Sequence, residues 1–295
     1  MVIPRDDKQI RDTIAYWIKR GVRWFKVYRD TSPKDLETII FEAHRHNAKV
    51  TGHLCSITFE EAANMGIDGI EHGLNSTSDF RNDKTYGICN GSREYIDTLD
   101  ITRETVKDLI RLMVEKNVFM TSTLAIYESS ISGRALADQR TLDAMAPFLV
   151  DQYKERRAQF NSLTSNDTIR ENRLKRIMAF ERRFFKMGGT LTAGVDPGRH
   201  VLPGYGDQRN FELLIEAGFT AEEAIKIMTK NGADVLSKTT IGSIAQGKRA
   251  DFIILNGNLK ENPTVIRNVD MVFKKGYGYD PKSILEEVRG KFGER

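Results

Sequence analysis

The chain has 295 residues, 40% of them hydrophobic, which suits one large globular domain or a domain with an appendage. Its 45 basic and 41 acidic residues give a net charge of +4 without a dense cationic patch, so nucleic-acid binding is set aside. No apolar run reaches the roughly 20 residues that span a membrane, and residues 1–10 are too polar for a secretory signal.

These features leave the compartment and the assembly open. The protein is cytoplasmic if Met1 is the natural start, and export is compatible with the sequence if a segment precedes it. The two cysteines, Cys55 and Cys89, have no metal-like spacing, and one pair is too few to indicate an oxidising compartment. A homo-oligomer is equally compatible with this composition.

Strand-like and helix-like segments alternate along the chain. A helix is predicted over residues 8–20, and Ser32 with Pro33 begins a second one that ends near Asn47. Capping-box pairs that begin two further helices are Thr58 with Glu61 and Thr220 with Glu223. The apolar, strand-like runs lie near 22–28, 49–54, 69–74, 118–123 and 190–196. Five strands alternating with helices predict an α/β fold, although a closed barrel needs eight.

Four side chains that could ligate a metal stand at the ends of strand-like runs. They are Lys26 in VRWFKVY, His53 in KVTGHL, His72 in GIEHGL and Asp196 in TLTAGVD. In β/α barrels the chemistry is built from residues at the C-terminal ends of several strands. Neutral histidine nitrogen suits a metal such as zinc, and two histidines on neighbouring strands can converge on one ion. The pattern therefore predicts a metal site at the mouth of a β/α barrel.

Taken singly, each of these residues has a plainer explanation. A strand-end lysine is usually a surface residue that keeps its charge in solvent, and a single histidine is more often a hydrogen-bonded core or rim residue. Asp196 precedes Pro197 and Gly198 and so fits a simple turn. The order and spacing of His53 and His72 favour ligand roles for the two histidines, and the strand before Asp196 favours catalysis over a turn.

The segment from about 125 to 186 is longer than a normal connection between barrel elements. It is polar, and its two runs with spaced apolar residues, joined by NSLTSN, predict two amphipathic helices. One hypothesis is that part of this insertion forms a lid or a subunit contact. The alternative is a lengthened pair of outer helices.

Together these residues resemble the amidohydrolase superfamily, in its imidazolonepropionase-like and prolidase-like branch, over nearly the whole chain. The resemblance implies that Lys26 ends the family's fourth strand and becomes carboxylated, that His53 and His72 end the fifth and sixth, and that Asp196 ends the eighth. The runs NGADVL, IGSIAQGKRADFIILNG and NVDMVFKKGYGYD are similar to the strands that complete the family's small β-sandwich. The expected fold is a partial TIM-type barrel, strands 4–8 of the family, over residues 1–236, with part of a β-sandwich at 237–280 and a C-terminal helix at 281–295.

One departure from the family concerns its first strand, which carries a His-x-His pair. Only a helix precedes Lys26 here. The chain's one His-x-His, His44-Arg45-His46, falls within the predicted helix 33–47, where residues two apart do not share a face. We therefore expect His44 and His46 to be solvated helix residues and the chain to lack the family's N-terminal part.

The resemblance also implies an activity: hydrolysis of a carbon–nitrogen bond in a small amide, cyclic amide or dipeptide by a metal-bound hydroxide. The implied cofactors are one or two divalent ions, most often zinc, and a CO2-derived carbamate on Lys26. Asp196 would be a ligand and the general base and acid. By position, Tyr28, two residues past Lys26 on the same face, and His200, in the loop after Asp196, are candidates for substrate contact. Strand alternation puts Trp24, Lys26 and Tyr28 on one face, which predicts an apolar surround for the lysine. The alternatives are an inactive or partner-completed barrel fragment, or a mononuclear-metal isomerase or decarboxylase.

Overall fold

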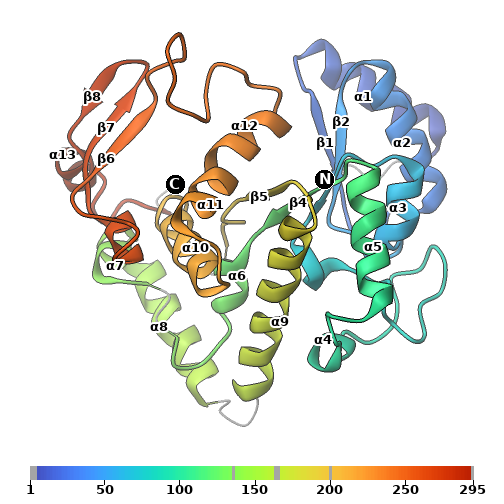
Figure 1. Cartoon of the computed structure of the whole chain (residues 1–295), viewed down its shortest axis with the longest axis horizontal. Helices are drawn as coiled ribbons and strands as arrows, with labels where there is room; N and C mark the ends of the chain where they lie inside the picture. The colour runs from blue at the N-terminus through green and yellow to red at the C-terminus, as the bar shows by residue number, and fades with distance from the viewer. Residues whose placement is uncertain (1–4, 135–136, 163–166, 199–200, 294–295) are drawn as a thin grey trace. The chain divides into compact units, whose positions relative to one another are not determined.

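The computed structural model describes residues 5–134, 137–162, 167–198 and 201–293. They form two compact units (Figure 1). The first unit comprises residues 1–122 and 179–191, and the second comprises residues 123–178 and 192–295. Each unit has its own sheet and its own core, and each is described by itself.

The first unit is built from alternating helices and parallel strands. Its elements are α1 (Asp7–Lys19), β1 (Trp24–Val27), α2 (Pro33–Arg45), β2 (Lys49–Gly52), α3 (Phe59–Met65), β3 (Gly69–Glu71), η1 (Gly73–Ser76), α4 (Tyr95–Thr98), α5 (Glu104–Glu115) and β4 (Phe119–Ser122). The strand β5 (Leu191–Ala193) begins there and completes a sheet of order β1-β2-β3-β4-β5. All five predicted strands and the predicted α/β class are confirmed.

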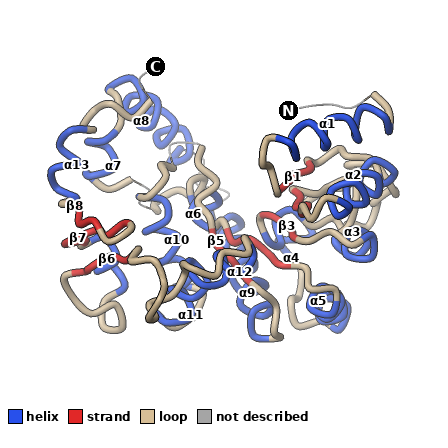
Figure 2. Tube along the Cα trace, turned by 90° about the horizontal axis from the view of Figure 1, so that it is seen from above, coloured by secondary structure: helices blue, strands red, loops and turns tan. Residues whose placement is uncertain are grey.

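Local sequence signals explain where these helices begin and end. Ser32 accepts a hydrogen bond from the Asp35 backbone at the start of α2, and Thr58 with Glu61 forms the predicted capping box of α3. The helix α3 ends at Gly66, whose φ of 92° is the left-handed conformation that glycine adopts without a Cβ clash. In two views, α1, α2, α3 and α5 follow one another along one face of the sheet (Figures 1 and 2).

The register of the parallel strands sets which side chains share a face. Lys26 on β1 pairs with Thr51 on β2, and Thr51 pairs with Gly69 on β3. Residues at paired positions of parallel strands point to the same side, as do residues two apart on one strand. Lys26, Thr51 and Glu71 therefore lie on one face. The Trp24 and Phe119 rings meet on this face too, with centroids 5.5 Å apart, over Gly69.

The second unit contains the long insertion and the C-terminal part of the chain. Its elements are α6 (Leu124–Glu128), α7 (Gln139–Ala144), α8 (Pro147–Ser162), most of α9 (Asp167–Lys186), α10 (Tyr205–Glu216), α11 (Ala221–Lys226), η3 (Ile227–Asn231), α12 (Gly232–Val235), β6 (Phe252–Leu255), η4 (Pro263–Arg267), β7 (Val269–Lys274), β8 (Tyr277–Tyr279) and α13 (Pro281–Glu287). Strands β6, β7 and β8 form a separate antiparallel sheet with α13 beside it (Figure 1).

The insertion departs from the expectation of two amphipathic helices. The helical conformation is interrupted at Met145 and Ala146, between α7 and α8, because Pro147 disfavours helical conformation in the residue before it. The backbone N–H of Ala146 donates to the Phe292 carbonyl instead. None of the α8 side chains that the structure describes is buried, but Leu149 and Val150 are partly buried and pack against Ala144, Met145 and Leu202.

A buried ion-pair network joins three helices of the second unit. Glu128 on α6 has a fully buried side chain and accepts hydrogen bonds from Arg134 and Arg209. Arg134 also binds Glu171 on α9 and Glu216 on α10. Arg134 binds three carboxylates and Glu128 binds two arginines, so the network ties residue 134 to α6, α9 and α10. That part of the insertion forms a lid or a subunit contact stays a prediction.

Candidate functional site

Two of the predicted ligands lie side by side in the first unit. His53 follows β2 and His72 follows β3, and these strands are neighbours in the sheet. The centroids of the two imidazole rings are 4.6 Å apart, with the ring planes inclined by 66°. Parallel strands bring side chains at their carboxyl ends to the same edge of the sheet. The structure thus places both rings at the predicted end of the strands.

Strict strand alternation does not explain why the two rings meet. Thr51 and His53 share a face of β2, and the Thr51 hydroxyl donates to Glu71 Oε1 at 2.8 Å, so Glu71 occupies that face of β3. The next residue should point the opposite way. His72 instead adopts a left-handed conformation, with φ 70° and ψ 17°, and its ring turns towards His53.

Burial keeps both imidazoles neutral. It lowers the pKa of His53 to about 3, with further lowering by His72 and by the charges of Arg93, Lys26 and Arg29. Burial lowers the pKa of His72 to about 4, again helped by Lys26 and Arg93. A neutral ring nitrogen is the form that binds a metal ion.

The Nε2 atom of His53 tests whether these residues fit a metal ion. It is buried and has no hydrogen-bond partner among the described residues. An unpaired buried polar atom is costly and needs an explanation, such as an ion that occupies the site. The two neutral histidines and the unpartnered Nε2 atom of His53 fit a metal ion of intermediate softness such as zinc.

Lys26 lies on the same face as the histidine pair but is exposed. It forms no hydrogen bond or ion pair with any residue that the structure describes. The predicted apolar surround is wrong, because β1 is an edge strand with a neighbour on one side only.

The remaining predicted residues are divided between the units. The Tyr28 ring lies 5.0 Å from the His53 ring and is 46% exposed, at the rim of the pair. Asp196 belongs to the second unit, three residues after β5, with φ 47°. His200 lies outside the described residues. Within the described ranges, no group of three or more His, Cys, Asp or Glu side chains is arranged to hold a metal ion.

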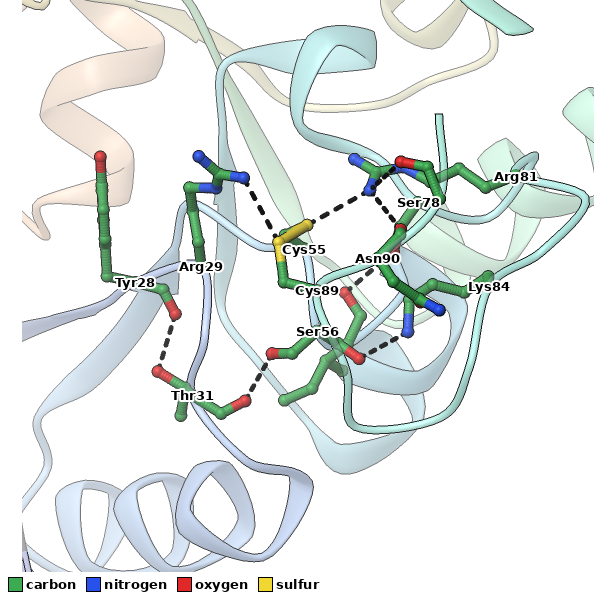
Figure 3. Close-up of a disulfide and its surroundings, with 12 residues drawn as sticks. Tyr28, Arg29, Thr31, Cys55, Ser56, Ser78, Arg81, Lys84, Cys89 and Asn90 are labelled. Atoms are coloured by element: carbon green, nitrogen blue, oxygen red, sulfur yellow. Dashed lines mark hydrogen bonds between the residues drawn. A yellow bond between two sulfur atoms is a disulfide. The ribbon is translucent and has the colours of Figure 1, made fainter. Parts of the chain in front are cut away.

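A disulfide between Cys55 and Cys89 was not foreseen from the sequence. These cysteines are 34 positions apart, and the bond ties the loop before Asn90 to the residues that follow His53 (Figure 3). Arg29 Nη2 lies 3.4 Å from the Cys89 sulfur, and Arg81 Nη1 lies 3.3 Å from the Cys55 sulfur. The only sequence signal was that the chain has two cysteines.

Further hydrogen bonds hold this loop to the strand ends. Lys84 Nζ donates to the Ser56 carbonyl at 2.7 Å, and the Ser56 hydroxyl donates to the Thr31 carbonyl at 2.6 Å (Figure 3). Sequence reasoning also missed the cations near the histidines, Arg29 and Arg93. Arginines in loops carry no specific pattern, so no signal singled them out.

Both expected helix histidines lie on the surface of the first unit or near it. His44 is exposed, and its Nε2 atom lies 2.9 Å from Asp68 Oδ2. His46 Nε2 lies 3.5 Å from Glu42 Oε1, one helical turn away. Neither histidine belongs to the pair formed by His53 and His72, as the sequence predicted.

A parallel sheet flanked by helices, with paired histidines beyond its strands, is the arrangement of a partial TIM-type β/α barrel with a candidate metal site. The chain belongs to the Amidohydrolase family, whose model matches residues 9–277. No protein with a curated description matches it. Among the described residues, every helix is too short or too polar to span a lipid bilayer.

Solved structures share this fold at low sequence identity. A Xaa-Pro dipeptidase with bound methionine is 19% identical, with a TM-score of 0.60 over 94% of this chain and 59% of its own. Ochratoxinase from A. niger is 20% identical, with a TM-score of 0.61 over 99% of this chain and 59% of its own. Phenylurea hydrolase B is 17% identical, with a TM-score of 0.57 over 94% of this chain and 57% of its own. This chain thus spans about three fifths of the length of these relatives.

Proposed function

We propose that this chain carries part of the metal centre of a hydrolase that breaks carbon–nitrogen bonds in small amides or dipeptides. The observation that carries the proposal is the neutral pair of His53 and His72, with the buried, unpartnered Nε2 atom of His53. Membership of the Amidohydrolase family, which generally uses divalent metals, supports it.

The chain's own residues would hold the metal at the carboxyl ends of β1, β2 and β3. His53 and His72 supply neutral nitrogen, and Lys26, on the same face of the sheet, would supply oxygen after it is carboxylated. A divalent ion, most readily zinc, would polarise the substrate carbonyl and make water a better nucleophile at neutral pH. Because Lys26 is exposed, its carboxylation would depend on the ion rather than on burial.

Asp196 and Tyr28 complete the proposed roles. Asp196 follows β5 in the chain as His53 follows β2, and its carboxylate would take a proton from water and pass it to the leaving nitrogen. Tyr28, at the rim beside His53, would contact the substrate. His200 is proposed for substrate contact by its place in the sequence after Asp196.

A dipeptide or related small amide is the proposed substrate class. One structural neighbour is named as a Xaa-Pro dipeptidase, and ochratoxinase and phenylurea hydrolase B are others. No observation on this chain favours isomerisation or decarboxylation. Hydrolysis in 18O-labelled water separates the classes, because only hydrolysis places solvent oxygen in the acid product.

Metal binding tests the proposal directly. We expect Co2+ to bind this chain with the visible absorption of a nitrogen-ligated ion, and replacement of His53 or His72 by Ala to weaken binding at least about tenfold. His44→Ala is the matched control, because His44 is an exposed histidine of the same unit that binds Asp68. Equal Co2+ binding by all three variants would overturn the assignment of the ligands.

Activity is then measured on protein isolated from its native source with a panel of dipeptides and N-acyl amino acids. We expect metal-dependent release of amine, with one solvent oxygen in the acid product. Co2+ binding without turnover of any amide would support an inactive or partner-completed barrel instead.

A further inference from the structure

The ring of His72 faces His53, and the backbone at residue 72 is left-handed. That conformation costs a residue with a Cβ atom roughly 1–2 kcal/mol. It persists only where surrounding contacts hold it in place.

The peptide group between Glu71 and His72 is held at both of its polar atoms. Its carbonyl, on Glu71, accepts a hydrogen bond from the hydroxyl of Ser76, a fully buried residue of η1. Its N–H, on His72, donates to the Thr121 carbonyl on β4 at 3.0 Å. The peptide plane therefore cannot rotate without breaking two buried hydrogen bonds.

A third contact fixes the side chain that precedes this peptide. Thr51, 7% exposed, donates from its hydroxyl to Glu71 Oε1 at 2.8 Å. This bond joins β2 and β3 through residues that lie two positions before His53 and one before His72. It keeps Glu71 on the face of Thr51, so that His72 can reach the same face only through its left-handed turn.

We infer that Thr51, Glu71 and Ser76 are positioning residues that hold the left-handed turn at His72 and thereby aim its imidazole at His53. Thr51 fixes the position of the Glu71 side chain, and Ser76 fixes the orientation of the peptide group between Glu71 and His72. None of the three needs to touch a metal ion or a substrate. That the turn serves metal binding rests on the proposed function. The three contacts that hold the turn, here called the clamp, are a property of the metal-free chain.

The test reads the ring geometry without a metal. In protein with 13C-labelled histidine, we expect a nuclear Overhauser contact between the His53 and His72 rings, whose centroids are 4.6 Å apart. Thr51→Val, which keeps the shape but removes the hydroxyl, and Ser76→Ala should each abolish this contact. Glu71→Gln keeps an accepting oxygen and should retain it. Unchanged His44 and His46 signals would show that the first unit is still folded.

Two further variants serve as matched controls. Thr229→Val removes a threonine hydroxyl that donates to the Ile225 carbonyl in the second unit, and it should leave the ring contact intact. Thr51→Ser keeps the hydroxyl and should behave as the unaltered chain. If Thr51→Val disturbs the His44 and His46 signals, Ser76→Ala alone decides the result.

Retention of the ring contact in folded Thr51→Val and Ser76→Ala would overturn the inference. Co2+ titration separates this outcome from failure of the proposed function. We expect each of these variants to lower Co2+ affinity about tenfold or more, as loss of outer contacts to metal ligands does. If the unaltered chain binds no Co2+, and the ring contact is present in the unaltered chain but absent from the variants, the inference about the clamp holds and the proposed function fails.

Discussion

The carboxyl group of Glu181 lies against the backbone of Gly73, the residue after His72. A Cβ atom placed on Gly73 would lie 2.7 Å from Glu181 Oε1. Glu181 is fully buried, and neither of its carboxyl oxygens has a hydrogen-bond partner of good geometry among the described residues. The turn that carries His72 is therefore packed on this buried carboxyl group.

The ionisation of Glu181 should make the stability of the first unit depend on pH. Burial raises the pKa of Glu181 from 4.5 to about 8, against a smaller opposing effect of Ser122. A raised pKa means that the folded state favours the neutral acid. The contribution of Glu181 to the unfolding free energy is complete below about pH 4.5. It is lost progressively as pH rises to about 8, at roughly 1.4 kcal/mol per pH unit.

Urea unfolding at pH 7 and pH 8 measures this effect through tryptophan fluorescence, since both tryptophans, Trp17 and Trp24, lie in the first unit. His53 and His72 add an opposite pH dependence only below about pH 7, because their folded pKa values are lowered from 6.5. Glu181→Gln should make the unfolding free energy nearly independent of pH between pH 7 and pH 8. Glu115→Gln, at an exposed position of α5, is the control and should leave the pH dependence as it is. An unchanged slope in Glu181→Gln would show that another group is responsible.

The same contact predicts an asymmetry between two glycines with positive φ. Gly73→Ala should lower the unfolding free energy by about 2–4 kcal/mol, because the new methyl group meets Glu181 and the left-handed backbone is strained as well. At Gly21, with φ 89°, nothing lies within 4 Å of a built Cβ, so Gly21→Ala should show only the backbone strain of about 1–2 kcal/mol.

Urea unfolding of the two variants, and of the double variant Gly73→Ala with Glu181→Ala, separates these terms. Truncation of Glu181 should restore part of the stability that Gly73→Ala loses. Equal losses at Gly21 and Gly73 would mean that the carboxyl group yields freely and the packing does not constrain the turn.

The disulfide should stabilise the first unit by constraining its unfolded chain. Closing a loop between cysteines 34 positions apart corresponds to about 2–4 kcal/mol. The variant with both Cys55→Ser and Cys89→Ser should unfold at correspondingly lower urea concentration. The unaltered chain in a reducing agent should match this variant, and a reduced chain as stable as the oxidised one would contradict the prediction.

The elements that the sequence predicted well are those with local signals. Caps at Ser32, Thr58 and Thr220 mark helix starts, and the runs that end at His53 and His72 are strands. The same periodicity could not show how the two rings meet. A period of two places Glu71 and His72 on opposite faces, and only the left-handed turn, held by contacts from residues far apart in sequence, reverses this.

Other features depend on tertiary contacts in the same way. The burial of Lys26 was inferred from its strand neighbours, but exposure depends on its edge position in the sheet. Cys55 and Cys89 meet because the loop before Asn90 folds back, which the spacing of two cysteines does not reveal. The division of the chain into the segments 1–236, 237–280 and 281–295 stays a prediction.

Asp196 is the proposed proton carrier. Asp196→Asn removes the basic oxygen while keeping the size of the side chain and one oxygen that can still bind a cation. Turnover of an amide substrate by the native protein should fall by about 100-fold or more, because a positioned base contributes on the order of 100-fold to 10,000-fold. Metal content, measured by elemental analysis, should stay close to that of the unaltered protein. Asp207→Asn is the control, since Asp207 caps the start of α10 through the Gly204 N–H. Undiminished turnover in Asp196→Asn would remove Asp196 from the mechanism, whereas loss of metal together with turnover would make it a ligand first.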